Sequence, residues 1–322
     1  MKPRVLYYEV LEFLPENQKR LEGCFDLVRL ESPDRDTPEL LSTLDAVVAP
    51  LKYQWDAAKI DAGAKLRVIA SCTGLNAHID VDHANARGIK VIHLQGEFED
   101  MRITSTPEHT FGLILNLTRR VPWAHKAVVS EQWNRNDWVA TRMLSNSELG
   151  IVGLGRVGQR VAGYGTGFGM KVRYFDPYVD GSPVEGVSRV ATLEELVAQS
   201  DIVTLHVMLS EENRNLINKN VLDRFRSGSF LINAARGPLV DSAALLEALE
   251  HGPLAGAALD VIPEEFDHDF TGDVGDHPLV QYARMHDNLL ITPHIAGSTL
   301  DSWGSCQVRI IEMLAEALEE SR

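Results

Sequence analysis

Cysteine is scarce in this sequence, with three residues, Cys24, Cys72 and Cys306, among 322. Their odd number and wide spacing predict neither a disulfide framework nor a zinc site, and we expect no bound metal. Isolated thiols are typical of a reducing compartment, so we expect a cytoplasmic protein. Long apolar runs are also lacking, because no stretch approaches the roughly 20 uninterrupted apolar residues of a membrane helix. Glu9 interrupts the first apolar run too early for a signal peptide.

Positive charge is in deficit. The 31 Lys and Arg residues face 46 Asp and Glu residues, which gives a formal net charge of −15. Such a surface repels nucleic acid and anionic membranes, and neither is expected as a partner. An anionic ligand would therefore need a local concentration of positive charge. With 44% hydrophobic and 24% charged residues the chain has the composition of a folded protein, and its length suits two domains.

The first hundred residues alternate between short apolar segments and polar segments of helical period. This alternation predicts a parallel sheet covered by helices. The predicted strands are 5–8, 26–30, 46–49, 67–70 and 90–93, with helices over 15–24 and 38–43 between them.

A second alternation begins near residue 149. Its six predicted strands with helical connections match a doubly wound nucleotide-binding sheet. These strands are 150–154, 172–175, 202–207, 230–234, 257–261 and 289–291. Ser105 to Glu108 has the pattern of a capping box and opens a helix over 109–120, and another helix is predicted over 302–320. The stretch 121–146 is less regular, and we interpret its three tryptophans as packing or subunit contacts.

The segment after the first strand of this second set carries G-x-G-x-x-G at Gly153, Gly155 and Gly158. In a strand–turn–helix context these glycines allow a tight turn, a close approach to pyrophosphate and close helix–strand packing. Asp176 ends the next strand, 18 residues beyond Gly158. A carboxylate there binds ribose hydroxyls and repels a 2′-phosphate, which favours NAD over NADP. The alternative is an Asp that caps a helix before Pro177.

Several further motifs follow in a fixed order, and together they resemble the D-isomer-specific 2-hydroxyacid dehydrogenases. The resemblance covers nearly the whole chain and lies in residues 151–158, 233–237 (Asn-Ala-Ala-Arg-Gly), 257–261 with Glu265, and 292–299. It implies an NAD(H)-dependent enzyme that moves a hydride to or from C2 of a small D-2-hydroxy or 2-oxo acid. The alternative is an NAD-sensing interaction protein, because related corepressors share this fold.

The resemblance assigns the family's catalytic Arg, Glu and His to Arg236, Glu265 and His294. Each role suits the chemistry. An arginine forks onto the substrate carboxylate, and a histidine donates a proton to the carbonyl oxygen as hydride reaches the carbon. The carboxylate of Glu265 would hold the tautomer of His294 and favour its protonated form. Taken singly, an Arg after a strand and a His after Pro are also typical of surface and loop residues.

Cofactor contacts are implied for Arg156 and Val157, which lie within the glycine motif, and for His206. Asp260 matches the family position beside the nicotinamide, although an Asp is also common where a strand ends. Met208 stands where the family usually has Pro.

Substrate contacts are implied for Thr73 and Gly74, in a loop (71–76) that resembles the family's carboxylate-binding loop. Lys52 follows a predicted strand and would suit a second anionic group on the substrate, whereas a solvated surface lysine is the alternative. Glu108 and His109 resemble the start of the interdomain helix and are interpreted as structural.

The overall expectation is an α/β protein with two Rossmann-like domains. A doubly wound NAD domain (104–294) is inserted into a smaller, flavodoxin-like substrate domain made of 1–103 and 295–322. Related enzymes are generally dimers through the cofactor domain, so a homodimer is expected. Phe266, where Pro is common, and a longer acidic loop over 266–288 depart from the family's pattern.

Overall fold

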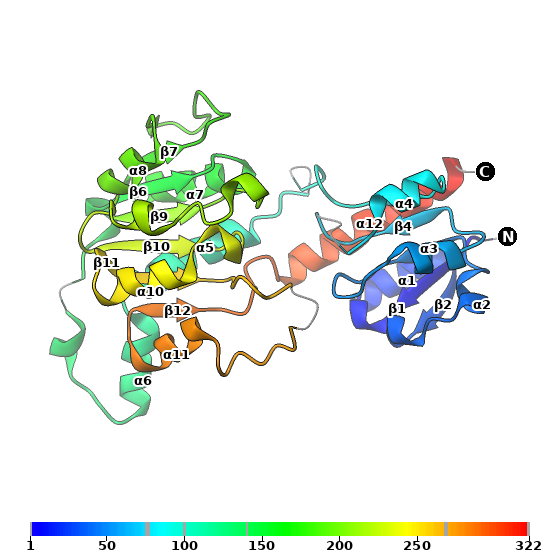
Figure 1. Cartoon of the computed structure of the whole chain (residues 1–322), viewed down its shortest axis with the longest axis horizontal. Coiled ribbons are helices and arrows are strands. Elements are labelled where there is room, and N and C mark those ends of the chain that lie inside the picture. The colour runs from blue at the N-terminus through cyan, green and yellow to red at the C-terminus, as the bar shows by residue number, and fades with distance from the viewer. Residues whose placement is uncertain (1, 75–77, 99–100, 140, 267–269, 321–322) are drawn as a thin grey trace. The chain divides into compact units, whose positions relative to one another are not determined.

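The computed structural model describes residues 2–74, 78–98, 101–139, 141–266 and 270–320. The chain forms two compact units, drawn in Figure 1. Unit 1 comprises Met1–Ile103 and Thr299–Arg322, and unit 2 comprises Thr104–Ser298. These boundaries lie at 103/104 and 298/299, against the predicted 103/104 and 294/295.

Unit 1 is built on a parallel sheet whose described strands have the order β2-β1-β3-β4-β5, the doubly wound order of flavodoxin. Its strands are β1 (Arg4–Tyr8), β2 (Asp26–Leu30), β3 (Ala46–Val48), β4 (Val68–Ala70) and β5 (Lys90–Ile92). Its helices are α1 (Pro15–Cys24), α2 (Pro38–Leu41), α3 (Ala57–Ala62), α4 (Val81–Ala86) and α12 (Leu300–Glu320).

Both faces of this sheet are buried. Val5 and Tyr7 of β1 pack into one apolar cluster with α12, while Leu6 and Tyr8 pack into a second cluster on the other face. Because successive side chains of a strand point to opposite faces, a sheet covered on both sides needs continuous apolar strands. This is why the strands were visible in the sequence.

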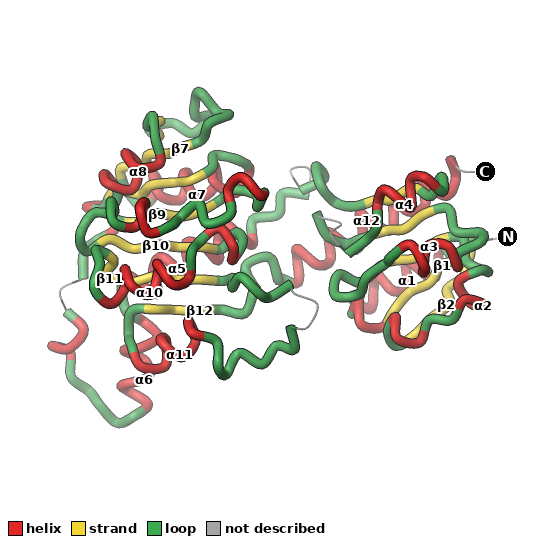
Figure 2. The backbone as a smooth tube through the Cα atoms, in the orientation of Figure 1, coloured by secondary structure: helices red, strands yellow, loops and turns green. Residues whose placement is uncertain are grey.

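Unit 2 contains a second parallel sheet, drawn in yellow in Figure 2. Its described strands have the order β12-β11-β10-β9-β6-β7-β8. Its strands are β6 (Glu148–Val152), β7 (Lys171–Phe175), β8 (Val187–Arg189), β9 (Ile202–Leu205), β10 (Ser229–Asn233), β11 (Leu254–Leu259) and β12 (Leu289–Ile291). Its helices are α5 (Ser105–Thr118), α6 (Val121–Val129), α7 (Arg156–Gly167), α8 (Leu193–Gln199), α9 (Lys219–Leu222), α10 (Ser242–Glu250) and α11 (Pro278–Met285). The predicted α/β class with two doubly wound sheets is confirmed.

Three local predictions were wrong. The edge strand β8 was missed, because it is short and largely exposed and so has no apolar run to reveal it. Helix α5 begins without a capping box: its N-cap is Thr104, whose hydroxyl donates to Glu108 Oε1 at 2.5 Å rather than capping the backbone. The acidic stretch 266–288, predicted as a loop, contains helix α11 (Pro278–Met285).

The less regular stretch after α5 begins with helix α6. Trp123 is buried there, which fits a packing residue, and Trp133 is 88% exposed, which leaves the predicted subunit contact open.

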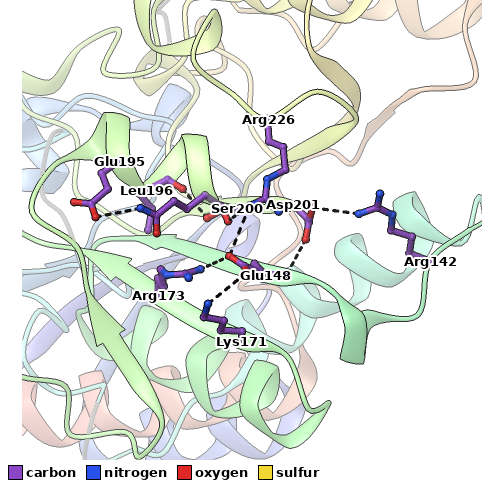
Figure 3. Close-up of polar contacts among 10 residues, drawn as sticks. Arg142, Glu148, Lys171, Arg173, Glu195, Leu196, Ser200, Asp201 and Arg226 are labelled. Atoms are coloured by element: carbon purple, nitrogen blue, oxygen red, sulfur yellow. Dashed lines mark hydrogen bonds and ion pairs between the residues drawn. The ribbon is translucent and has the colours of Figure 1, made fainter.

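The amino ends of the central strands of unit 2 are joined by charged side chains (Figure 3). Glu148, the first residue of β6, pairs with Arg173 and Lys171 of β7. Asp201, which precedes β9, pairs with Arg226 at 3.0 Å and Arg142 at 3.4 Å. Its second oxygen accepts the Glu148 backbone N–H at 2.9 Å. We call this set of residues the amino-edge network.

No helix in the described part of the chain is both long enough and apolar enough to cross a membrane.

Candidate active site

The glycine motif forms the turn between β6 and α7. Gly153 has a φ of 90°, and a Cβ there would lie 2.7 Å from the His206 carbonyl oxygen. A Cβ at Gly158 would lie 2.1 Å from the Gly153 carbonyl oxygen, so α7 can start this close to the strand only with glycine. A Cβ at Gly155, the N-cap of α7, would meet no atom within 4 Å, and no side chain caps the helix. The backbone amides at a helix start without a side-chain cap suit a pyrophosphate.

Asp176 directly follows β7 and is buried. Its carboxylate accepts the backbone N–H of Leu154 and that of Tyr178, each at 2.8 Å. Among the described residues the next element after Asp176 is the strand β8 and not a helix, so the helix-capping alternative was wrong. Each carboxylate oxygen has a second lone pair, which leaves acceptor capacity for ribose hydroxyls. The same side chain therefore fixes the glycine turn and stays able to bind a ribose.

Other residues expected at the cofactor lie around the same turn. Arg156 and Val157 are the first residues of α7, and Val157 packs against the apolar core. His206 follows β9, and its Nε2 lies 3.0 Å from Thr204 Oγ1. Burial lowers the pKa of His206 to about 3, so its ring is neutral at pH 7. The glycine turn, with a neutral imidazole at His206 and the cationic Arg156 at the start of α7, fits a dinucleotide.

His294 and Glu265 are in contact. His294 Nδ1 lies 2.7 Å from Glu265 Oε2. Because a carboxylate only accepts, Nδ1 carries the hydrogen and Nε2 is left to exchange a proton with a ligand. The other carboxylate oxygen, Glu265 Oε1, is buried and has no hydrogen-bond partner among the described residues. An unpaired buried acceptor is costly and marks a place where a ligand or a shared proton is expected.

A network of hydrogen bonds around Asp260 holds the loop that carries His294. Asp260 is buried directly after β11 and accepts the Thr292 hydroxyl at 2.5 Å and the backbone N–H groups of Ile295 and Ala296 at 3.0 and 2.8 Å. Within this loop His294 has a φ of 53°, the left-handed region that side chains other than glycine rarely adopt.

The same hydrogen-bond network determines the protonation state of Asp260. Burial raises the pKa of this carboxyl group, but hydrogen bonds from His109, Thr292 and the two backbone amides outweigh it, so the pKa is lowered overall. His109 Nε2 lies 3.2 Å from the Thr292 hydroxyl oxygen. Since that hydroxyl gives its hydrogen to Asp260, His109 is the donor in this contact. Asp260 is therefore ionised, and it holds the His294 loop through these hydrogen bonds. Its contact with a nicotinamide stays a prediction.

Arg236 is the N-cap of a short turn after β10 and is held by its neighbours. Asn233 donates to the Arg236 carbonyl oxygen at 2.9 Å and accepts the Ala235 N–H at 3.0 Å. A Cβ at Gly237 would lie 2.1 Å from the Ile262 backbone, which brings the Arg236 turn against the segment that leads to Glu265. Burial lowers the pKa of Arg236 while Glu265 raises it, and an arginine stays charged in either case.

Residues 111–296 match the family model described as D-isomer specific 2-hydroxyacid dehydrogenase, NAD binding domain. The chain is also 36% identical over 320 residues to a glyoxylate reductase of Thermofilum pendens, a match that covers 96% of this chain and 89% of the relative. The chain belongs to the D-isomer specific 2-hydroxyacid dehydrogenase family. NAD is the cofactor of this family's domain, which here is unit 2.

Two further comparisons bound what the family implies. The chain is 35% identical over 268 residues to a D-3-phosphoglycerate dehydrogenase of Bacillus subtilis, covering 83% of this chain but 48% of that relative. It therefore spans about half the length of that protein. A solved D-lactate dehydrogenase of Aquifex aeolicus, complexed with NAD and lactic acid, superimposes with a TM-score of 0.82 at 27% identity and covers 98% of this chain and 96% of its own.

In this family member, unit 2 brings together Arg236, Glu265 and His294, because each follows the carboxyl end of a strand in one parallel sheet. We call this side of unit 2, where the glycine motif and Asp176 also lie, its carboxyl edge. His109 and Thr292 were missed as parts of the site. The sequence contained a signal for each: Thr292 opens the motif 292–299, and His109 lies at the start of the helix that was interpreted as structural.

The remaining predicted residues belong to unit 1. The hydroxyls of Ser71 and Thr73 lie 2.9 Å apart after β4, and a Cβ at Gly74 would lie 2.8 Å from the Phe98 ring. The last residues of this predicted loop, 75 and 76, lie outside the described residues. Lys52 is exposed in the turn after β3. Their contacts with a substrate stay predictions.

Proposed function

We propose that this protein is an NAD(H)-dependent oxidoreductase that transfers a hydride between the nicotinamide and C2 of a small D-2-hydroxy acid or 2-oxo acid. The observation that carries the proposal is the 2.7 Å contact between His294 Nδ1 and Glu265 Oε2, on the same sheet edge as the glycine turn. Interconversion of a hydroxyl and a carbonyl requires a positioned acid–base group beside the hydride carrier. The relatives are named as reductases and dehydrogenases of small acids, which supports it.

When bound, the cofactor supplies or takes up the hydride. The forked guanidinium of Arg236 anchors the substrate carboxylate. In reduction, protonated His294 donates its Nε2 proton to the carbonyl oxygen. Glu265 holds the opposite side of the ring through Nδ1 and compensates the positive charge that His294 carries before the transfer. In oxidation, neutral His294 accepts the hydroxyl proton.

Asp176 binds the adenosine ribose in this proposal, and Arg156, Val157, His206 and Asp260 line the rest of the cofactor. Unit 1 serves as the substrate domain. We propose that its backbone at Thr73 and Gly74 binds the substrate carboxylate, because an overall charge of −15 makes local donors necessary.

A homodimer in the cytoplasm completes the proposal. Exposed apolar side chains cluster between the end of α5 and the start of β6 in unit 2, which supports a protein partner there. They are Val121, Val128, Val129, Trp133, Val139 and Met143. The three free cysteines support a reducing compartment. No observation favours the alternative of an NAD-sensing interaction protein, and we do not propose it.

The deciding experiment follows NADH absorbance at 340 nm while the purified protein is mixed with a panel of 2-oxo acids, with NADPH in parallel. We expect saturable oxidation of NADH with at least one acid and much weaker use of NADPH. Retained NADH binding without turnover of any acid would overturn the proposal.

A further inference from the structure

One aromatic side chain at the carboxyl edge of unit 2 is left unused by the mechanism above. Phe266 follows Glu265 and lies against His294, with ring centroids 5.5 Å apart and planes at 75°. Although it touches the acid–base residue, Phe266 is 55% exposed and belongs to no apolar core cluster of the described residues. Ile295, which directly follows His294 in the chain, is also partly exposed, at 43%.

An exposed phenylalanine contributes little to folding, because most of its ring stays in water. Ligand sites in proteins combine apolar or aromatic side chains with a few placed polar groups, and Phe266 beside His294 and Glu265 has this arrangement. Here the apolar surface borders the imidazole that would exchange a proton with the substrate. The ligand portion that it covers must therefore lie next to the reacting carbonyl.

The shape of a 2-oxo acid identifies that portion. C2 is trigonal and carries the carboxylate, the carbonyl oxygen and the C3 group. With the carboxylate at Arg236 and the oxygen at His294, the C3 group is what remains to meet a side chain that packs against the imidazole. A carboxylate or phosphate there would lose hydration against a phenyl ring and gain no partner from it.

We propose that Phe266 is a specificity-determining residue that packs on the C3 group of the substrate and selects 2-oxo acids with an apolar C3 group. This inference rests on the proposed function. It predicts a substrate class with alkyl or aryl side chains and disfavours acids that carry a second carboxylate or a phosphate at this position.

The experiment measures kcat/KM with NADH for glyoxylate, pyruvate, 4-methyl-2-oxopentanoate and oxaloacetate, in the wild type, Phe266→Ala and Phe266→Leu. Glyoxylate is the internal reference because it has no C3 group. We expect wild-type kcat/KM to rise from glyoxylate to 4-methyl-2-oxopentanoate. In F266A the value for 4-methyl-2-oxopentanoate should fall about tenfold, the effect of removing one good apolar contact, while that for glyoxylate changes less than threefold. F266L should recover most of the loss.

Met285→Ala is the matched control, since Met285 is 80% exposed on α11 and should leave every ratio unchanged. If the wild type reduces these acids but F266A keeps the same preference, the inference is wrong and the proposed function stands. A uniform loss on all four acids with a lower Tm would show a structural role and also overturn it. A wild-type preference for oxaloacetate would overturn it as well. If the wild type turns over no acid with NADH, the proposed function itself fails.

Discussion

The two edges of the sheet in unit 2 handle charge in opposite ways. At the amino edge, Glu148 and Asp201 are matched by basic partners in a closed network (Figure 3). At the carboxyl edge, Arg236 has no ion pair within 4 Å among the described residues, and Glu265 leaves one oxygen unpaired there. His294 is also held in a left-handed conformation.

The difference separates stability from function. Paired charges stabilise the amino edge, whereas an unpaired carboxylate oxygen and a strained backbone persist at the carboxyl edge, where a ligand would complete them. Both edges belong to one sheet, so substitutions at one edge serve as controls for the other. We expect amino-edge changes to alter the free energy of unfolding and carboxyl-edge changes to alter kinetics.

The largest kinetic effect is expected for His294→Asn. Asparagine tolerates the left-handed conformation that His294 adopts, so the loop should survive. Without the acid–base group, kcat should fall by about 10² to 10⁴. NADH binding, followed by fluorescence titration, should be unchanged. A variant with near wild-type kcat would remove His294 from the mechanism. It would also contradict the functional role assigned to the carboxyl edge.

Arg236→Lys should have the next largest effect. Lysine keeps the charge but loses the planar fork that binds a carboxylate with two hydrogen bonds. We expect KM for the 2-oxo acid to rise about 100-fold, with little change in Tm or in NADH binding. Steady-state kinetics beside a thermal melt test both parts. A large drop in Tm with unchanged KM would place Arg236 among the structural charges instead.

Asp201→Ala probes the opposite edge. The change removes the acceptor of Arg226 Nη1 and that of the Glu148 backbone N–H, so the free energy of unfolding should fall by about 2 kcal/mol. The values of kcat and KM should stay within twofold of wild type. Arg142→Ala is the control, because that side chain is mostly exposed and its pair with Asp201 should contribute little. Urea unfolding and kinetics on both variants decide the matter. A kinetic loss in D201A without a stability loss would contradict the division between the edges.

His206 predicts a pH dependence at the carboxyl edge. Its pKa is about 3 in the folded state and about 6.5 in an unfolded chain. Above pH 6.5 His206 is neutral in both the folded and the unfolded state, so it does not make the free energy of unfolding depend on pH. As the pH falls from 6.5 towards 3, only the unfolded state takes up the proton, so stability falls by about 1.4 kcal/mol per pH unit. His206→Asn should lose this slope.

The measurement is urea unfolding of the wild type and H206N without cofactor at pH 7, 6 and 5. Thr204→Val removes the hydrogen bond to His206 but not the titration, so it should keep the wild-type slope. Parallel pH curves for the wild type and H206N would show that the folded state takes up the same proton.

The fold was largely predictable because both sheets are covered on two faces and their central strands are mostly apolar. β8 escaped because an exposed edge strand has no such signal. Arg236, Glu265 and His294 were reached through motif order, and their placement follows from parallel strands ending at one edge. The hydrogen-bond network around Asp260 that holds the His294 loop was not predictable, because His109 lies 183 residues from Thr292 in the chain. The packing of Phe266 on His294 likewise depends on how a loop closes, which composition and spacing do not encode.

The smallest effect is expected for Lys52→Ala in unit 1. Lys52 also follows the carboxyl end of a strand, β3, yet it is exposed. A solvated lysine without a fixed partner holds an anion weakly, because water competes for both charges. We therefore expect KM to change less than threefold for pyruvate and for oxaloacetate. A tenfold rise in KM confined to oxaloacetate would instead show that Lys52 binds a second carboxylate. That result would contradict the preference for an apolar C3 group proposed for Phe266. Steady-state kinetics with these two acids thus tests whether position at a carboxyl edge is enough for function, or whether a side chain must also be held there.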